Sequence, residues 1–204
     1  MNFLALDTSG GYLTVVACKN DEFFSTYIPD CAMKQSTLVM GAVDETLKKA
    51  NLALADCDFF GAVVGAGSFT GIRIGISVAK GFALAYNKPT LPITSFEVMA
   101  YDVVNGKSLC LVDALHGSYY ACGYDGATAL FEPSFWTEDT ALAWAKEQNA
   151  RLVALSPLSL DGCRQADAVN GLQCAVKQKA MANEFGELTA LYVRKSSAEE
   201  NLTK

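Results

Sequence analysis

Residues 59–86 of this chain read FFGAVVGAGSFTGIRIGISVAKGFALAY. The first seven residues form a continuous apolar run closed by a glycine, which is typical of a β-strand buried on both faces. A Gly-rich turn, residues 65–71, follows directly and leads into a helical segment that ends before Asn87-Lys88-Pro89. The stretch therefore predicts a buried strand, a tight turn and a helix in immediate succession.

The predicted helix that ends near Tyr86 is apolar around nearly its whole circumference, because Arg73 and Lys80 are its only charged residues. One buried face cannot account for such a helix. Gly75 and Gly81 are small enough to let another helix approach closely. We expect this helix to be buried on two sides, either against a second protein or as the central helix of one large domain.

Three short strands are predicted upstream, at residues 3–7, 12–18 and 23–28, and the turn residues between them indicate an antiparallel meander. Ser36 is a good N-cap for a helix over residues 37–50, which carries an apolar stripe on one side and charged residues on the other. The first half of the chain is therefore expected to place three strands and a helix before the buried strand.

The second half of the chain predicts a further set of strands and helices. A short strand end and a connecting helix are expected over residues 93–105, after which two paired strands restart the pattern. We therefore expect two domains, residues 1–104 and the smaller residues 105–204. The other elements predicted in this half are strands at 108–113, 119–124 and 151–155, a helix at 137–148, and a helical tail.

The composition favours a folded protein that meets a partner and does not grip nucleic acid alone. Of the 204 residues, 51% are hydrophobic and 19% are charged, so we expect part of the apolar excess to face a partner. The net charge of −6 argues against nucleic-acid binding, since Lys and Arg supply most of the non-specific affinity. We therefore do not expect this chain to bind nucleic acid on its own.

The cysteines and the chain start predict a cytoplasmic protein. The seven cysteines form no CxxC pair and read as buried thiols of a reducing compartment. The first residues match a strand and not a signal peptide, and no apolar run reaches the approximately 20 residues that span a membrane. We expect no membrane association.

The Gly-rich turn suits a phosphate cradle, in which backbone N–H groups at a helix N-terminus meet an anion. Gly67 and Ser68 would then contact the phosphate. The turn lacks the Gly-Lys-Ser/Thr ending of a Walker A loop, and its glycines are spaced GxGxxxG. A strand-to-helix connection without any ligand accounts for the same residues.

Asp7, Thr8 and Ser9 end the first predicted strand and precede a glycine turn. A carboxylate beside two hydroxyls would suit phosphate and magnesium. The alternative is a turn cap, because Asx and Ser/Thr side chains bond neighbouring backbone in such turns without a ligand. With Gly67 and Ser68, these residues form the candidate nucleotide site.

Catalytic chemistry has little support in the sequence. Ser68 is flanked by Ala66 and Thr70, so no GxSxG elbow exposes it as a nucleophile. His116 is the only histidine, which excludes multi-histidine metal sites, and the cysteines lack ligand spacing. His116 as a base for Ser68 is the remaining possibility, but a lone histidine in a Gly-containing turn is more often a solvated loop residue. We predict no catalytic residue and no metal site.

Several motifs together resemble the TsaB (YeaZ) family. The most specific is Gly-Ser-Phe-Thr-Gly-Ile-Arg-Ile-Gly, residues 67–75, and the resemblance extends over essentially the whole chain. The other motifs are Leu4-Ala5-Leu6-Asp7-Thr8-Ser9, Ala79-Lys80-Gly81, Ser95-Phe96-Glu97, Val112-Asp113-Ala114 with Tyr120, and Leu191-Tyr192-Val193-Arg194 before Ala198-Glu199.

The resemblance implies a two-domain α/β fold of the actin-like ATPase type (ASKHA, ribonuclease H-like). It also implies a role in making threonylcarbamoyladenosine at position 37 of tRNA, with this chain as a non-catalytic scaffold. In such a complex the related protein TsaD carries the metal and transfers the threonylcarbamoyl group, and the ATPase TsaE joins them. The chain itself would then require no cofactor, and ATP with magnesium would bind at the level of the complex.

The family resemblance also implies that the two N-terminal helices form homodimer and heterodimer contacts. The sequence departs from the family at Ala66, where proline is common, and at Gln35-Ser36-Thr37, which replaces His-Ser-Glu. The rival hypothesis is an ATP-binding phosphotransferase or ATPase of the same fold, which would use Asp7 and residues 67–71. The residues expected at the interface are Leu38, Ala42, Ile72, Arg73, Ile76, Lys80 and Ala83, among which Arg73 holds the turn or binds an anion.

Overall fold

The computed structural model describes residues 1–102 and 106–193. Its first half forms a mixed sheet in the order β3-β2-β1-β4-β5. The first three strands are antiparallel neighbours, and β4 and β5 continue the sheet parallel to β1, so the predicted meander and buried strand are confirmed. The strands are β1 (Phe3–Asp7), β2 (Leu13–Lys19), β3 (Glu22–Ile28), β4 (Phe59–Gly65) and β5 (Thr90–Thr94).

The second sheet repeats the arrangement of the first. β6 pairs antiparallel with β7, β7 pairs antiparallel with β9, and β10 and β11 extend the sheet in parallel on the other side of β6. The order β9-β7-β6-β10-β11 thus matches β3-β2-β1-β4-β5 strand by strand, and the predicted two-part α/β fold of the actin-like type is confirmed. The strands are β6 (Lys107–Asp113), β7 (Ser118–Asp125), β8 (Thr128–Ala129), β9 (Ser134–Thr137), β10 (Arg151–Ala154) and β11 (Arg164–Gln165).

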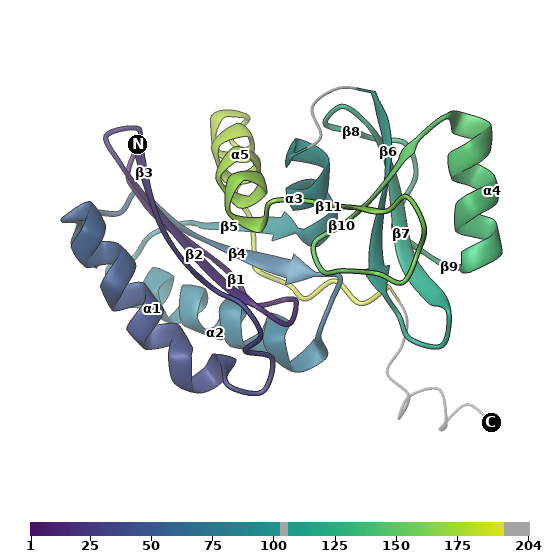
Figure 1. The fold of residues 1–204 in the computed structure, drawn as a ribbon. Helices are drawn as coiled ribbons and strands as arrows, with labels where there is room; N and C mark the ends of the chain where they lie inside the picture. The colour runs from purple at the N-terminus through teal and green to yellow at the C-terminus, as the bar shows by residue number, and fades with distance from the viewer. Residues whose placement is uncertain (103–105, 194–204) are drawn as a thin grey trace.

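Helices and sheets alternate in layers (Figure 1). α1 (Gln35–Ala50) and α2 (Phe69–Tyr86) cover the outer face of the first sheet. α3 (Ser95–Asp102) and α5 (Ala168–Met181) lie on its other face, between the two sheets. α4 (Glu138–Gln148) covers the outer face of the second sheet, and a short 3₁₀ helix (Leu54–Asp56) precedes β4.

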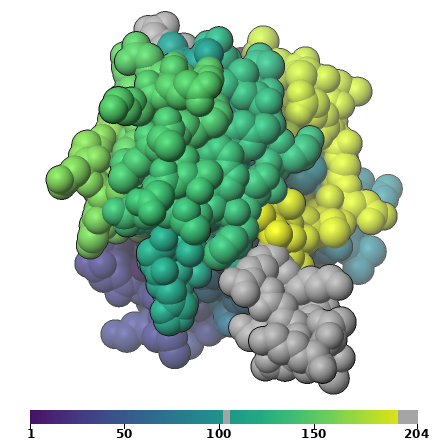
Figure 2. Space-filling model, turned by 90° about the vertical axis from the view of Figure 1, so that its right-hand side faces the viewer, coloured from purple at the N-terminus to yellow at the C-terminus, as the bar shows by residue number. Residues whose placement is uncertain are grey.

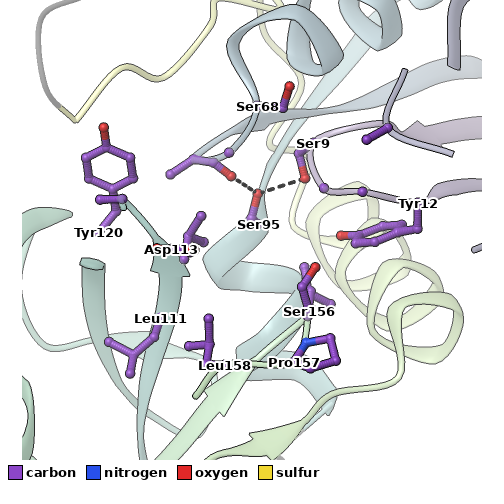
Figure 3. A pocket seen from close by; sticks show the side chains of 18 of the residues that line it. Ser9, Tyr12, Ser68, Ser95, Leu111, Asp113, Tyr120, Ser156, Pro157 and Leu158 are labelled. Carbon is purple, nitrogen blue, oxygen red and sulfur yellow. Dashed lines mark hydrogen bonds between the residues drawn. The ribbon is translucent and has the colours of Figure 1, made fainter. Parts of the chain in front are cut away.

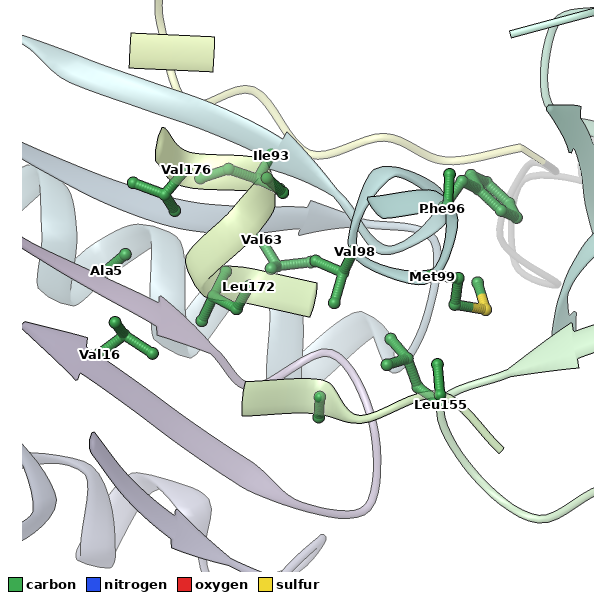
Figure 4. Packing of buried hydrophobic residues seen from close by; sticks show 14 of the residues in the cluster. Ala5, Val16, Val63, Ile93, Phe96, Val98, Met99, Leu155, Leu172 and Val176 are labelled. Atoms are coloured by element: carbon green, nitrogen blue, oxygen red, sulfur yellow. The ribbon is translucent and has the colours of Figure 1, made fainter. Parts of the chain in front are cut away.

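The main hydrophobic core fills the space between the two sheets (Figure 4). Val16 and Ile93 of the first sheet, Leu172 of α5 and Met99 of α3 belong to the same buried cluster as Leu155, which follows β10. Two further clusters attach α1 and α2 to the first sheet and α4 to the second. Because the main cluster draws on both halves, apolar burial stabilises their relative position.

α1 begins earlier than predicted. Its first residue is Gln35, Lys34 stands at the N-cap without a side-chain hydrogen bond, and Ser36 lies exposed in the first turn. The prediction that Ser36 caps this helix is therefore wrong. The cause is the buried Gln35 side chain, whose Nε2 lies 2.6–3.1 Å from three carbonyl oxygens between the end of β1 and the start of β2. The start of α1 is therefore set by these contacts with a distant part of the chain, and not by a local N-cap.

α2 is buried on one side only. Ile72, Ala79 and Ala83 pack into the first half of the chain, whereas Leu84 is 86% exposed. The interpretation of α2 as the central helix of one large domain is therefore wrong, since no described residue encloses its outer side. Burial of α2 on two sides would require a second molecule.

The chain returns to the first sheet after α5. The backbone N–H of Gly186 donates to the carbonyl oxygen of Thr90 (3.0 Å), and that of Leu191 donates to the carbonyl oxygen of Val64 (2.7 Å). In Figure 2 this C-terminal segment, in yellow, lies on the surface beside the green second half. The last described residues therefore contact the first sheet although they belong to the second half of the sequence.

Several predictions meet the limits of the described residues. The division into residues 1–104 and 105–204 stays a prediction, and the motif residues Arg194, Ala198 and Glu199 lie outside the described part of the chain. Five of the seven cysteines are buried, as predicted, whereas the prediction is wrong for Cys163 and Cys174, which are half-buried. Within residues 1–102 and 106–193, no helix has the length and apolar character needed to cross a membrane.

Candidate functional site

A cleft of about 670 Å³ lies between the two halves, where β1 and β6 end (Figure 3). The first half contributes the β1–β2 connection, the Gly-rich turn and the start of α3, and the second half contributes the end of β6 and the segment after β10. Among the described residues, no lysine, arginine or histidine lines this cleft. Its polar side chains are Ser9, Tyr12, Ser68, Ser95, Asp113, Tyr120 and Ser156.

Asp7 is completely buried beside this cleft. Its Oδ1 accepts hydrogen bonds from the backbone N–H of Ser9 (2.8 Å) and from Oγ of Ser9 (2.7 Å), and its Oδ2 accepts one from the hydroxyl of Tyr12 (2.8 Å). Burial raises the pKa of Asp7 above its ordinary value, although these hydrogen bonds act in the opposite direction. Both carboxylate oxygens are thus occupied by donors of the same chain.

Glycines at four-residue intervals bring the turn and α2 against the end of β1. A Cβ on Gly67 would overlap the carbonyl oxygen of Ser9, a Cβ on Gly71 would overlap that of Thr8, and a Cβ on Gly75 would lie 2.6 Å from Oγ1 of Thr8. Oγ1 of Thr8 in turn donates to the carbonyl oxygen of Gly71 (2.6 Å) and accepts from the backbone N–H of Gly75 (3.1 Å). Close packing by itself therefore accounts for the glycine spacing.

Ser68 caps α2. Its Oγ accepts a hydrogen bond from the backbone N–H of Gly71 (3.2 Å), and its own N–H donates to the carbonyl oxygen of Ser9 (2.7 Å). Ser95 at the start of α3 donates from Oγ to the carbonyl oxygen of Ala66 (2.5 Å) and contacts Oγ of Ser9 (3.2 Å), as the dashed lines in Figure 3 show. Hydroxyl groups thus tie three segments of the cleft wall together.

The structure brings the candidate nucleotide residues together but divides them into two layers. Ser9, Gly67 and Ser68 line the cleft, whereas Asp7 and Thr8 are buried and engaged by their own chain. Whether these residues bind a nucleotide stays a prediction. His116 lies exposed in a turn, as expected for a loop residue.

Sequence reasoning did not select Asp113 as a site residue. Asp113 ends β6 as Asp7 ends β1, and its exposed side chain lines the cleft with Oδ1 accepting from the backbone N–H of Leu115 (2.8 Å). The sequence contains a signal for Asp113, because this residue ends the first of the two paired strands predicted in the second half. The described residues contain no group of three or more His, Cys, Asp or Glu that could hold a metal ion.

A second hollow, of about 520 Å³, lies between α1 and α2 on the outer face; we call it the α1–α2 groove. Met40 and Phe69 line it and remain 51% and 44% exposed. Arg73 is the one charged residue among its described lining residues. The complete lining is Ser36, Val39, Met40, Phe69, Thr70, Arg73, Ile74, Ser77 and Val78.

The predicted interface residues take three different positions. Arg73 and Lys80 are exposed, and Leu38 and Ile76 are half-buried. The other three, Ala42, Ile72 and Ala83, are buried in the chain's own core. The interface itself stays a prediction, and the outer face offers it two apolar side chains that the sequence reasoning missed, Met40 and Phe69.

Comparison with known proteins gives the family. A family model described as TsaD: tRNA N6-adenosine threonylcarbamoyltransferase matches residues 26–185. The tRNA threonylcarbamoyladenosine biosynthesis protein TsaB of Bacillus subtilis (strain 168) is 29% identical over 70% of this chain and 63% of its own length. The TsaB of Escherichia coli (strain K12) is 30% identical over 61% of this chain and 55% of its own length. The chain belongs to the family of this model and, within it, to the TsaB (YeaZ) proteins.

The TsaB (YeaZ) fold extends over nearly the whole chain. The solved structure of YeaZ from Pseudomonas aeruginosa aligns with a TM-score of 0.78 at 21% identity, covering 94% of this chain and 99% of that one. The sequence matches to the two TsaB relatives span less than two thirds of those proteins. Family and fold are thus shown for this chain.

Proposed function

We propose that this chain is a non-catalytic subunit of the assembly that makes N6-threonylcarbamoyladenosine in tRNA. In this proposal it pairs with a TsaD-type transferase, engages TsaE, and meets tRNA only within the assembly. The relatives named TsaB support the biosynthetic role, since their names refer to tRNA threonylcarbamoyladenosine biosynthesis. A cytoplasmic location and a homodimer in the absence of the partner complete the proposal.

The observation that carries the proposal is the open apolar face of α1 and α2. Met40, Phe69 and Leu84 are 51%, 44% and 86% exposed on these two helices. Met40 and Phe69 line the α1–α2 groove, whereas Leu84 lies outside it near the end of α2, and exposed apolar side chains around a hollow are typical of a protein–protein contact site. α2 carries exposed apolar side chains, Phe69 and Leu84, besides the buried face that packs on the sheet, which supports a second buried face in a complex.

The chemistry of the cleft supports a subunit more than an enzyme. Asp7, the carboxylate that a magnesium ion would need, already accepts three hydrogen bonds within the chain. Asp113, the one charged residue among the described residues lining the cleft, is negative and would repel a phosphate that no cation neutralises. Neither feature favours a phosphotransferase.

The pairing is tested by light-scattering chromatography of the chain with the TsaD-type protein of the same genome. We expect a one-to-one complex for the wild type and its loss for Met40→Asp, because an aspartate would have to be desolvated in the contact. Leu142→Asp is the matched control, since Leu142 is 39% exposed on α4, on the far side of the second sheet. A wild-type chain that ignores the TsaD-type protein would overturn the proposal.

The rival function is an ATP-binding phosphotransferase or ATPase of the actin-like fold. Its support is the position of Ser9, Gly67 and Ser68 on the cleft wall. Titration calorimetry with Mg-ATP on the isolated chain decides between the two. Heat with one-to-one stoichiometry at submillimolar nucleotide would favour the rival, and its absence at millimolar nucleotide would remove it.

A further inference from the structure

Three side chains hold one another at the mouth of the α1–α2 groove. The guanidinium of Arg73 lies 3.7 Å from the ring centroid of Phe69, and the Tyr192 ring stacks on Phe69 with centroids 4.9 Å apart. Nε of Arg73 donates to the hydroxyl of Tyr192 (3.0 Å). We call this cluster the Arg73 clamp. It joins α2 to the C-terminal segment, which comes from the other end of the chain.

The clamp orients the arginine but leaves most of its hydrogen-bonding capacity open. A guanidinium carries five N–H donors in a planar fork, and the hydrogen bond of Arg73 to Tyr192 uses only Nε. Among residues 1–102 and 106–193, no carboxylate forms an ion pair with Arg73. The exposed fork therefore suits a carboxylate, which it can bind through two parallel hydrogen bonds.

The C-terminal segment makes the clamp rigid. Leu191, directly before Tyr192, donates from its backbone N–H to the carbonyl oxygen of Val64 (2.7 Å), and Leu188 is buried. Tyr192 is thus held to the first sheet and fixes Arg73 from a second direction. An arginine oriented before binding loses less conformational entropy when an anion arrives.

The surroundings of the clamp define the chemistry of the partner. The α1–α2 groove offers apolar and hydroxyl side chains and a single positive charge, that of Arg73. Its complement is an apolar helix ridge with one acidic side chain. A polyanion fits less well, because the groove offers only one cation and the chain carries a net charge of −6.

We propose that the Arg73 clamp anchors a carboxylate side chain of a partner helix that docks in the α1–α2 groove. This inference rests on the proposed function, so the partner is the TsaD-type protein. The apolar groove supplies the contact area, and the clamp fixes the register and orientation of the helix. Arg73 is therefore a specificity residue of the interface, and Phe69 and Tyr192 position it.

The test measures the dissociation constant of the complex with the purified TsaD-type protein, by titration calorimetry at low and high salt. We expect Arg73→Gln to weaken binding by about 10- to 100-fold, the range of a hydrogen bond to a charged group, and to lower the salt dependence. Arg73→Lys should recover only part of this loss, because an ammonium lacks the planar fork. Tyr192→Phe, which removes only the hydroxyl, should weaken binding by about 3- to 10-fold.

Lys146→Gln is the matched control, since Lys146 is exposed on α4, which covers the second sheet, and does not line the α1–α2 groove. We expect its dissociation constant to stay within about twofold of the wild type. If Arg73→Gln bound the TsaD-type protein as tightly as the wild type does, with the same salt dependence, the proposed role of the Arg73 clamp would be wrong and the proposed function would stand. A loss confined to self-association or to tRNA binding would also overturn it, whereas a wild type that does not bind would refute the proposed function. Melting temperatures of all variants exclude unfolding as the cause.

Discussion

Replacing Gly71 with alanine tests whether the Gly-rich turn is a packing device. A Cβ at this position would overlap the carbonyl oxygen of Thr8 and lie 3.1 Å from Oε1 of Gln35, and the Thr8 oxygen is backbone at the end of β1. Overpacking a rigid site costs about 3 kcal/mol, while alanine regains about 1 kcal/mol of helix propensity. We therefore expect a net loss of about 2 kcal/mol in the free energy of unfolding, which lowers Tm by about 4–8 °C for a chain of this size.

The matched control is Gly81→Ala in the same helix. No atom lies within 4 Å of a Cβ at Gly81, so the substitution should stabilise the chain by about 0.5–1 kcal/mol. Both variants are compared with the wild type by urea unfolding, followed by circular dichroism. If Gly71→Ala proved as stable as Gly81→Ala, the backbone at the end of β1 would shift at little cost in free energy, and the packing interpretation of the glycine spacing would be wrong.

Three further predictions concern buried polar groups. Thr8→Val should lower the free energy of unfolding by about 2 kcal/mol, because it removes the hydroxyl shared with α2, whereas Thr8→Ser should retain most of it; urea titration distinguishes them. Because the pKa of Asp7 is raised in the folded chain, its contribution to the free energy of unfolding falls as pH rises above about 4. The stability difference between the wild type and Asp7→Asn should therefore be smaller at about pH 8 than at about pH 4. Lys179→Met should cost about 2–3 kcal/mol in thermal or urea unfolding, because it leaves the mostly buried Glu97 unpaired (2.6 Å in the wild type). Lys48→Met, in an exposed pair, should change stability by less than about 0.5 kcal/mol.

The fold was most predictable where the pattern of the segment itself is strong. β1, β4 and α2 were found because a continuous apolar run or a bounded helical segment marks each of them. The short strands β8, β9 and β11 were missed because their pairing depends on β7 and β10 and not on a pattern of their own. The start of α1 was misplaced because contacts of Gln35 with the β1–β2 connection, distant in sequence, decide it.

The site was predictable in its membership but not in its roles. The sequence paired Asp7, Thr8 and Ser9 with the Gly-rich turn, and the structure brings these segments into contact. The choice between turn cap and ligand site needs the hydroxyl of Tyr12, which reaches Oδ2 of Asp7 only in the folded chain. The sequence likewise could not show that Met40 points outward, because this depends on which side of α1 packs against the sheet.

The two halves share one topology, but the aspartates that end their first strands lie in different surroundings. Asp7 at the end of β1 is buried and engaged by its own chain, whereas Asp113 at the end of β6 is exposed in the cleft. The cleft thus combines serine hydroxyls with one negative charge, which disfavours a phosphate that no cation neutralises. The α1–α2 groove combines exposed apolar side chains with the oriented cation of Arg73, which favours a protein carrying a carboxylate. The chemistry of the described surface therefore supports the proposal of a contact site on α1 and α2, and the end of β1 packs against the start of α2 beneath it.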